Sequence, residues 1–272
     1  MGGIAPERSL PKVAHFNFKK YLEENNKQPA KIGSTVVLFI DEFTRYLDVA
    51  VGKDAIDLLV GLGYTVVPFY GESGRTFISK GFLSQAKKLA GKNINALYEY
   101  SANGWPIVGL EPSAILSFRD EYHRFHLNEE KVASVSSNSW LIEEFLSKEI
   151  NDGAITSELF TKESTTIKIH NHCHQKALSN QKVTFDILNL PRNYAVTIIS
   201  SGCCGMAGSF GYEKEHYDVS MKIGGLKLFP AVEKAAHETI IADNGTSCRH
   251  QILDGTGRQA SHPVSILKNA LL

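Results

Sequence analysis

Apolar stretches of strand length alternate along the chain with stretches whose apolar residues recur at helical spacing. Thr35–Ile40 reads TVVLFI, a continuous apolar run typical of a strand buried on both faces of a sheet. The following segment, Val49–Leu62, has the apolar period of an amphipathic helix and stops at a glycine. The pattern predicts further strands at Tyr64–Tyr70 and Trp105–Leu110, with a second helix at Phe82–Ala90.

The same alternation begins again in the second half of the chain. Residues 123–160 are predicted to be a helical connection that leads into it. Strands alternating with helices of about ten residues indicate parallel sheets with right-handed crossovers, so the predicted fold class is α/β. In this second half the predicted strands are 167–170, 195–200 and 239–242, and the predicted helices are 175–190 and 213–236.

The two halves match each other as an internal repeat. The strand and loop at Phe43 align with those at Cys173, and the loop Gly71–Gly74 aligns with Gly202–Gly205. Three such matches occur in order, which predicts two tandem Rossmann-like α/β repeats related by a pseudo-two-fold axis. The third match pairs the segment at Ala114 with that at Cys248. The expected organisation is an N-terminal extension (1–30), a first repeat (31–122), the connection (123–160) and a second repeat (161–272).

Composition and charge narrow the class of protein. The chain has 272 residues, 43% of them hydrophobic, and 29 basic side chains balance 29 acidic ones. A globular chain without net charge gives no indication of a nucleic-acid or anionic-membrane partner. No apolar run reaches the length of a membrane span, and the N-terminus lacks a signal-peptide pattern. We therefore expect a cytoplasmic protein without a transmembrane segment, and peripheral attachment to the inner membrane through partners stays open.

All four cysteines lie in the second repeat, each after a predicted strand. Cys173 follows the first strand, Cys203 and Cys204 lie in a glycine-rich loop after the second, and Cys248 follows the third. The carboxyl ends of parallel strands meet at one edge of a sheet, so these thiols are predicted to form one site. Thiolates are soft ligands that suit an iron–sulfur cluster or zinc. The alternatives are four ordinary core cysteines or a strained disulfide between Cys203 and Cys204.

Histidines flank the first cysteine. His170, His172 and His174 alternate along an extended stretch, so an ideal strand would direct them to one face and Cys173 to the other. We therefore expect His174, and likewise His250, to support the site or carry protons rather than bind the metal.

Two residues next to the cysteines are also predicted to support the site. Gly205 gives the backbone freedom that lets two adjacent thiols turn toward one centre. Arg249 either offsets the negative charge of a thiolate cluster or lies on the solvated surface.

Three segments together resemble the cysteine-rich CCG domain of iron–sulfur oxidoreductases: His172–His174, Ser201–Met206 and Gly245–Ile252. The resemblance runs from about Pro6 to His262. It is strongest to the C-terminal iron–sulfur region of FAD-linked D-2-hydroxyacid dehydrogenases, which act on D-lactate, D-2-hydroxyglutarate or glycolate. The resemblance implies an oxidoreductase component that passes electrons from a flavin-dependent dehydrogenase to a downstream acceptor, without catalytic residues of its own.

The resemblance also implies a cofactor and its ligands. A [4Fe–4S] cluster would be held by Cys173, Cys203, Cys204 and Cys248. Gly245 stands where the family usually has a further cysteine, which argues against a five-thiolate cluster. FAD is expected on a partner subunit or another domain, together with a ferredoxin-type domain. The alternative function is a metal-stabilised interaction module that holds zinc or a non-redox cluster.

Overall fold

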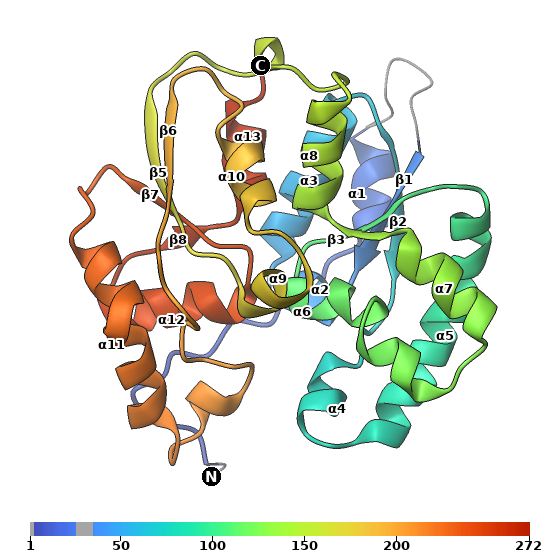
Figure 1. Cartoon of the computed structure of the whole chain (residues 1–272), viewed down its shortest axis with the longest axis horizontal. Helices are drawn as coiled ribbons and strands as arrows, with labels where there is room; N and C mark the ends of the chain where they lie inside the picture. The colour runs from blue at the N-terminus through green and yellow to red at the C-terminus, as the bar shows by residue number, and fades with distance from the viewer. Residues whose placement is uncertain (1–2, 26–34) are drawn as a thin grey trace.

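The computed structural model describes residues 3–25 and 35–272, which contain two parallel four-stranded sheets (Figure 1). The predicted α/β fold with parallel strands is confirmed. The strand orders are β2-β1-β3-β4 and β6-β5-β7-β8, so in each sheet the first strand in sequence lies between the second and the third. The first sheet comprises β1 (Thr35–Ile40), β2 (Thr65–Tyr70), β3 (Ile107–Gly109) and β4 (Ser139–Leu141), and the second comprises β5 (Thr165–Ile169), β6 (Tyr194–Ile198), β7 (Ile240–Ala242) and β8 (Ala260–Ser261).

Helices connect the strands and cover both faces of each sheet (Figure 1). The first half contains α1 (Phe18–Glu24), α2 (Glu42–Tyr46), α3 (Val49–Gly61), α4 (Arg75–Ser79), α5 (Leu83–Ala102), α6 (Pro112–Ile115), α7 (Glu129–Ser137) and α8 (Ile142–Asn151). The second half contains α9 (Cys173–Leu178), α10 (Lys182–Leu188), α11 (Tyr217–Glu233), α12 (Thr246–Thr256) and α13 (Pro263–Ala270). Four 3₁₀ turns lie at Leu116–Phe118, Glu121–Phe125, Ser157–Leu159 and Phe210–Tyr212.

The structure contains two strands that the sequence pattern did not predict. β4 lies within the stretch 123–160, which was predicted to be helical, and it pairs in parallel with β3. β8 pairs in the same way with β7. Both strands are too short, at three and two residues, to show a period of their own, so only their pairing identifies them. Helix α5 is also longer than predicted, at 20 residues.

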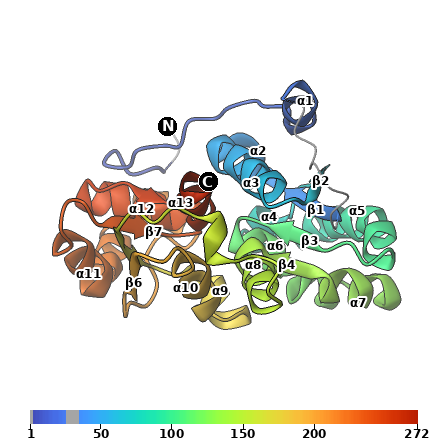
Figure 2. The same ribbon diagram turned by 90° about the horizontal axis from the view of Figure 1, so that it is seen from above.

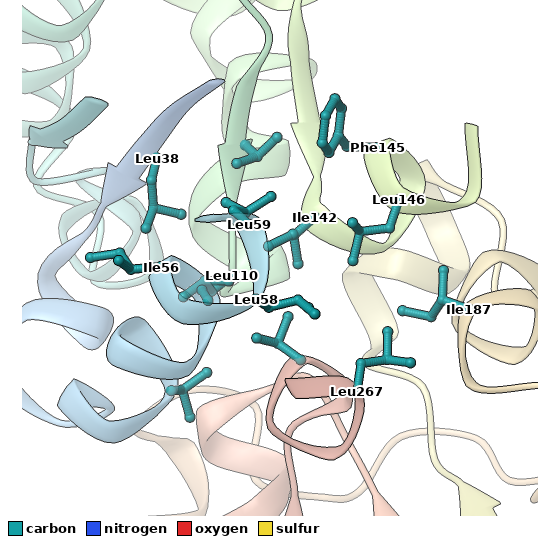
Figure 3. Packing of buried hydrophobic residues seen from close by; sticks show 14 of the residues in the cluster. Leu38, Ile56, Leu58, Leu59, Leu110, Ile142, Phe145, Leu146, Ile187 and Leu267 are labelled. Atoms are coloured by element: carbon teal, nitrogen blue, oxygen red, sulfur yellow. The ribbon is translucent and has the colours of Figure 1, made fainter. Parts of the chain in front are cut away.

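The two sheets share one hydrophobic core. Helices α3 and α8 from the first half pack against α10 and α13 from the second, between the sheets. Figure 3 shows Leu58 and Leu59 of α3 close to Leu146 of α8 and Leu267 of α13, all of them buried. Separate clusters lie on the outer faces, under α5 and α7 on one side and under α11 and α12 on the other. The halves therefore form one packed body rather than two independently cored domains.

The N-terminal segment spans both halves of the molecule (Figure 2). Arg8 is buried and donates to the backbone oxygen of Gly211 and to Ser220 Oγ, both in the second half. Phe18 of α1 is fully buried in the core against α3, in the first half. The predicted boundary between an N-terminal extension and the first repeat, at residues 30 and 31, lies outside the described residues. Within residues 3–25 and 35–272, no helix combines the length and the apolar character needed to cross a bilayer.

A buried acid lies where the halves meet, and it predicts how stability depends on pH. Glu143 on α8 is fully buried, and neither carboxylate oxygen has a hydrogen-bond partner among the described residues. Burial raises the pKa of this carboxyl from 4.5 to about 7. The pKa of Glu143 is higher in the folded than in the unfolded protein. Its contribution to the free energy of unfolding is therefore complete below about pH 4.5 and is lost as the pH rises through about 7.

Glu143→Gln is expected to remove this pH dependence. Between pH 4.5 and pH 8 the wild type should lose about 3 kcal/mol of unfolding free energy that the variant keeps. Urea unfolding of both proteins between pH 4.5 and 8 measures the effect. Glu99→Gln, at an exposed helical position, is the control and should follow the wild-type curve. Parallel curves for the wild type and Glu143→Gln would show that Glu143 does not titrate in this range.

Candidate metal centre

Three separate elements of the second half carry the four cysteines. Cys173 is the first residue of α9, directly after β5. Cys203 and Cys204 lie in the loop that follows β6, and Cys248 lies in the first turn of α12, after β7. All four are free thiols. As predicted, each cysteine follows the carboxyl end of a strand of the same parallel sheet.

All four cysteines line one cavity of about 390 Å³. Its wall includes residues of both halves, among them Phe43 of α2 and Arg75 of α4. Cys204 and Cys248 are buried, whereas Cys173 and Cys203 are partly exposed. The cavity therefore brings together one wholly buried pair of thiols and one pair that solvent reaches.

Neighbouring thiols affect one another's protonation. The nearby Cys173 and Cys204 lower the pKa of Cys203. The nearby Cys203 raises the pKa values of Cys173 and Cys204. The site therefore favours a thiolate at Cys203, the form that binds a metal.

Cys248 differs from Cys203 because of its surroundings. The hydrogen bond with Cys204 lowers the pKa of its thiol. Burial and the nearby Asp243 outweigh this effect, and the pKa is raised to about 11.

Backbone groups and tethering side chains hold the cysteine loop. The N–H groups of Gly205 and Met206 donate to the sulfur atoms of Cys203 and Cys204, at 3.3 and 3.5 Å. The ammonium group of Lys176 on α9 donates to the backbone oxygens of Ser201 and Gly202, each at 2.8 Å. The side chain of Gln251 on α12 donates to the backbone oxygen of Cys204 at 3.0 Å. These contacts fix the loop against both helices that carry the other two cysteines.

Gly205 is required by the geometry of the loop. Its φ is +98°, and a Cβ there would lie 2.2 Å from the backbone oxygen of Ser220. Left-handed backbone costs a residue with a side chain about 1–2 kcal/mol, and the overlap with a backbone atom adds to that cost. The loop therefore requires glycine at position 205, and the role of Gly205 in turning the two thiols toward one centre stays a prediction.

Gly205→Ala is expected to lower the melting temperature by about 2 °C or more, which corresponds to a loss above about 1 kcal/mol. Gly225→Ala is a matched control, because Gly225 lies inside helix α11 and a Cβ there meets nothing within 4 Å. Alanine favours helix over glycine by up to about 1 kcal/mol, so the control should melt at the same or a higher temperature. Thermal unfolding followed by circular dichroism compares the two. Equal melting temperatures would contradict the close contact at Gly205.

The histidines lie closer to the cysteines than an ideal strand would allow. β5 ends at Ile169, and Cys173 already begins a helix, so the predicted alternation of faces does not extend to this point. One ring nitrogen each of His172 and His174 and the sulfur of Cys173 all lie within 4.8 Å of one another. His174 Nδ1 is 3.8 Å from Cys173 Sγ. His250 on α12 is partly buried, and no described residue hydrogen-bonds its Nδ1.

Arg249 lies in a buried junction between the halves. Its guanidinium donates to Asp48 Oδ2 at 2.6 Å and to the backbone oxygen of Asp243 at 3.0 Å. Burial raises the pKa of Asp48, but Arg249 and the hydroxyl of Thr246 outweigh it and hold that pKa below its usual value. The side chain of Arg249 is only 11% exposed. The alternative prediction, that Arg249 lies on the solvated surface, is therefore wrong.

Two acidic residues near the cysteines were not identified from the sequence. Glu111 follows β3, and its Oε2 accepts from the backbone N–H of Thr246 at 2.8 Å, at the start of the helix that carries Cys248. Asp243 follows β7 and accepts from the backbone N–H of Gly245 at 2.7 Å. Both come directly after a parallel strand, so the rule that located the cysteines also applies to them.

Comparison with known proteins shows similarity along nearly the whole chain. No protein-family model matches the sequence. The chain is 27% identical over 273 residues to a subunit of the anaerobic glycerol-3-phosphate dehydrogenase of Escherichia coli (strain K12), covering 98% of this chain and 67% of that protein. It is 29% identical over 271 residues to the D-2-hydroxyglutarate dehydrogenase of the same strain, covering 96% of this chain and 25% of that enzyme.

A third relative extends the same similarity to another organism. The D-2-hydroxyglutarate dehydrogenase of Pseudomonas putida is 26% identical over 274 residues, covering 94% of this chain and 25% of that enzyme. The similarity thus includes both sheets, and the chain spans a quarter of the length of the D-2-hydroxyglutarate dehydrogenases it matches.

Proposed function

We propose that this chain is the electron-transfer part of a dehydrogenase and holds a [4Fe–4S] cluster on Cys173, Cys203, Cys204 and Cys248. The observation that carries the proposal is that these four thiols, delivered by three separate elements, line one cavity. Four scattered core cysteines would not be expected to share a cavity. A disulfide between Cys203 and Cys204 is not formed.

The residues of the site fit an iron–sulfur cluster. Four sulfur donors are the usual ligand set of a cubane cluster, and backbone N–H groups already point at two of the sulfur atoms. When bound, such a cluster would accept and donate one electron at a time. The chain's own residues hold the ligands in place, keep Cys204 and Cys248 away from water, and leave Cys173 and Cys203 accessible from the cavity.

The relatives support a dehydrogenase as the partner. One of them is named as a subunit of a glycerol-3-phosphate dehydrogenase, and the others are named as D-2-hydroxyglutarate dehydrogenases. We propose that substrate oxidation takes place on an FAD-bearing partner subunit or domain, acting on a 2-hydroxyacid, and that a ferredoxin-type domain belongs to the same assembly. This chain then connects the flavin with a downstream acceptor.

We also propose that the two halves are CCG-type repeats of Rossmann-like topology, related by a pseudo-two-fold axis. The identical order of four parallel strands in the two sheets supports the duplication. Phe43, at the start of the first half, lies in α2 directly after β1, as Cys173 lies in α9 directly after β5. Phe43 also lines the same cavity as the cysteines. In this interpretation the first repeat has lost its thiols and contributes an apolar wall.

Anaerobic purification followed by metal analysis tests the proposal. The expected product is a brown protein with about four iron and four sulfide per chain, whose visible absorption bleaches on reduction with dithionite. A protein with neither iron nor acid-labile sulfide, after reconstitution under reducing conditions, would overturn the proposal.

A zinc-stabilised interaction module is the second candidate function. The observation that favours it is that three donors, the side chains of His172, Cys173 and His174, lie within 4.8 Å of one another. Mixed nitrogen and sulfur ligands suit zinc. The same metal analysis separates the two functions, because the zinc protein would be colourless and would contain no sulfide.

A further inference from the structure

His170 is a buried histidine with one ring nitrogen unused. It directly follows β5 and is 1% exposed. Its Nδ1 lies 2.7 Å from Ser201 Oγ, at the start of the cysteine loop. Its Nε2 has no hydrogen-bond partner among the described residues. A buried polar atom without a partner is uncommon in a native protein and calls for a ligand or a bound water.

The unused nitrogen lies close to two thiols. One ring nitrogen of His170 and the sulfur atoms of Cys204 and Cys248 all lie within 4.8 Å of one another. Nδ1 already contacts Ser201 Oγ, which leaves Nε2 as the ring nitrogen without a partner. All three residues are buried, and they come from the ends of three different strands.

We propose that His170 binds the metal centre directly through Nε2, beside Cys204 and Cys248. The inference rests on the proposed function, because it concerns the same centre. Because the four thiolates supply one ligand to each iron of a cubane, His170 would be a fifth donor that shares an iron with Cys204 or Cys248. The site would then be a mixed thiolate–imidazole centre rather than one held by thiolates alone.

The surroundings of Gly245 support a donor from elsewhere in the chain. A Cβ at Gly245 would lie 2.3 Å from a ring carbon of His172. A cysteine at that position would therefore collide with the imidazole in its present place. Position 245 therefore supplies no donor in this packing, and the nitrogen donor that lies with Cys204 and Cys248 is His170.

The competing interpretation is an ion pair between His170 and Asp243. Asp243 is fully buried, and its Oδ2 lies 3.8 Å from His170 Nε2. This distance is too long for a hydrogen bond, and Oδ2 also has no partner among the described residues. The pair thus leaves both buried atoms unsatisfied, whereas a metal bound to Nε2 satisfies the histidine.

Pulsed electron paramagnetic resonance on the dithionite-reduced protein tests the assignment. The wild type should show a strong nitrogen coupling that changes when only histidine is labelled with ¹⁵N. His170→Gln and His170→Cys should lose this coupling, and His174→Gln should keep it. Imidazole ligands raise the potential of iron–sulfur centres relative to thiolates, so His170→Cys should also shift the midpoint potential downward.

Each outcome decides between the interpretations. A reduced wild-type cluster without histidine nitrogen coupling would overturn the His170 assignment and leave the proposed function intact, as would a coupling that is lost only in His174→Gln. A wild-type protein that contains no iron and no sulfide would overturn both. The isotope comparison uses the wild type alone, so it remains decisive even where a variant fails to fold.

Discussion

Cys204→Ser is expected to abolish the visible absorption of the purified protein. Cys204 is buried, at 3% exposed, next in sequence to Cys203 and within 4.8 Å of Cys248, so it lies in the middle of the donor set. A serine hydroxyl is a harder donor than a thiol and does not ionise near neutral pH, so it is a poor replacement for a soft ligand. Iron and sulfide analysis together with the visible spectrum measures the loss.

The electron-transfer role makes a second prediction for the same variant. Electron transfer from the flavin partner to the downstream acceptor should fall to background, whereas oxidation of substrate with an artificial acceptor should continue. Ser209→Ala is the control, because Ser209 lines the same cavity at an exposed position and offers no soft donor. If Cys204→Ser kept the wild-type iron content and colour, the proposed ligand set would be wrong.

Arg249→Ala is expected to lower the free energy of unfolding by about 2 kcal/mol, because it removes charge-assisted hydrogen bonds from a partly buried ion pair. The change leaves the carboxylate of Asp48 without its cation and the backbone oxygen of Asp243 without its donor. Both groups lie where the first half meets α12. The substitution therefore weakens the contact that holds the helix carrying Cys248 in place. Urea unfolding of the metal-free protein under reducing conditions measures it.

A double-mutant cycle with Asp48→Asn separates the ion pair from general packing. If the pair accounts for the effect, Arg249→Ala should cost clearly less in the Asp48→Asn background than in the wild type. Lys222→Ala, at an exposed position on α11, is the surface control and should change stability by less than about 0.5 kcal/mol. A similarly small change for Arg249→Ala would show that the buried pair does not stabilise the junction.

The sequence by itself determined the fold class and the position of several strands and helices, although α5 is longer than predicted and the predicted helix 175–190 is two helices, α9 and α10. TVVLFI at Thr35–Ile40 was predicted as a strand and forms β1 with the same bounds, because an apolar run of this length has few alternatives in a parallel sheet. It also predicted that the four cysteines form one site, from the rule that parallel strands end at the same edge. All four line one cavity, but the close donor groups divide them: Cys204 and Cys248 lie in one group and Cys173 in another. A single four-thiol site therefore stays a prediction.

Only the tertiary structure decided which polar groups meet. β4 and β8 are recognised by the strands they pair with, since two or three residues have no detectable period. Arg249 could equally have faced water, and its burial depends on Asp48, which is distant in the sequence. His170 lies near two thiols, and its Nε2 has no partner among the described residues, because β5 ends where it does. Such long-range contacts arise from packing two sheets around one core, and local periodicity contains no information about them.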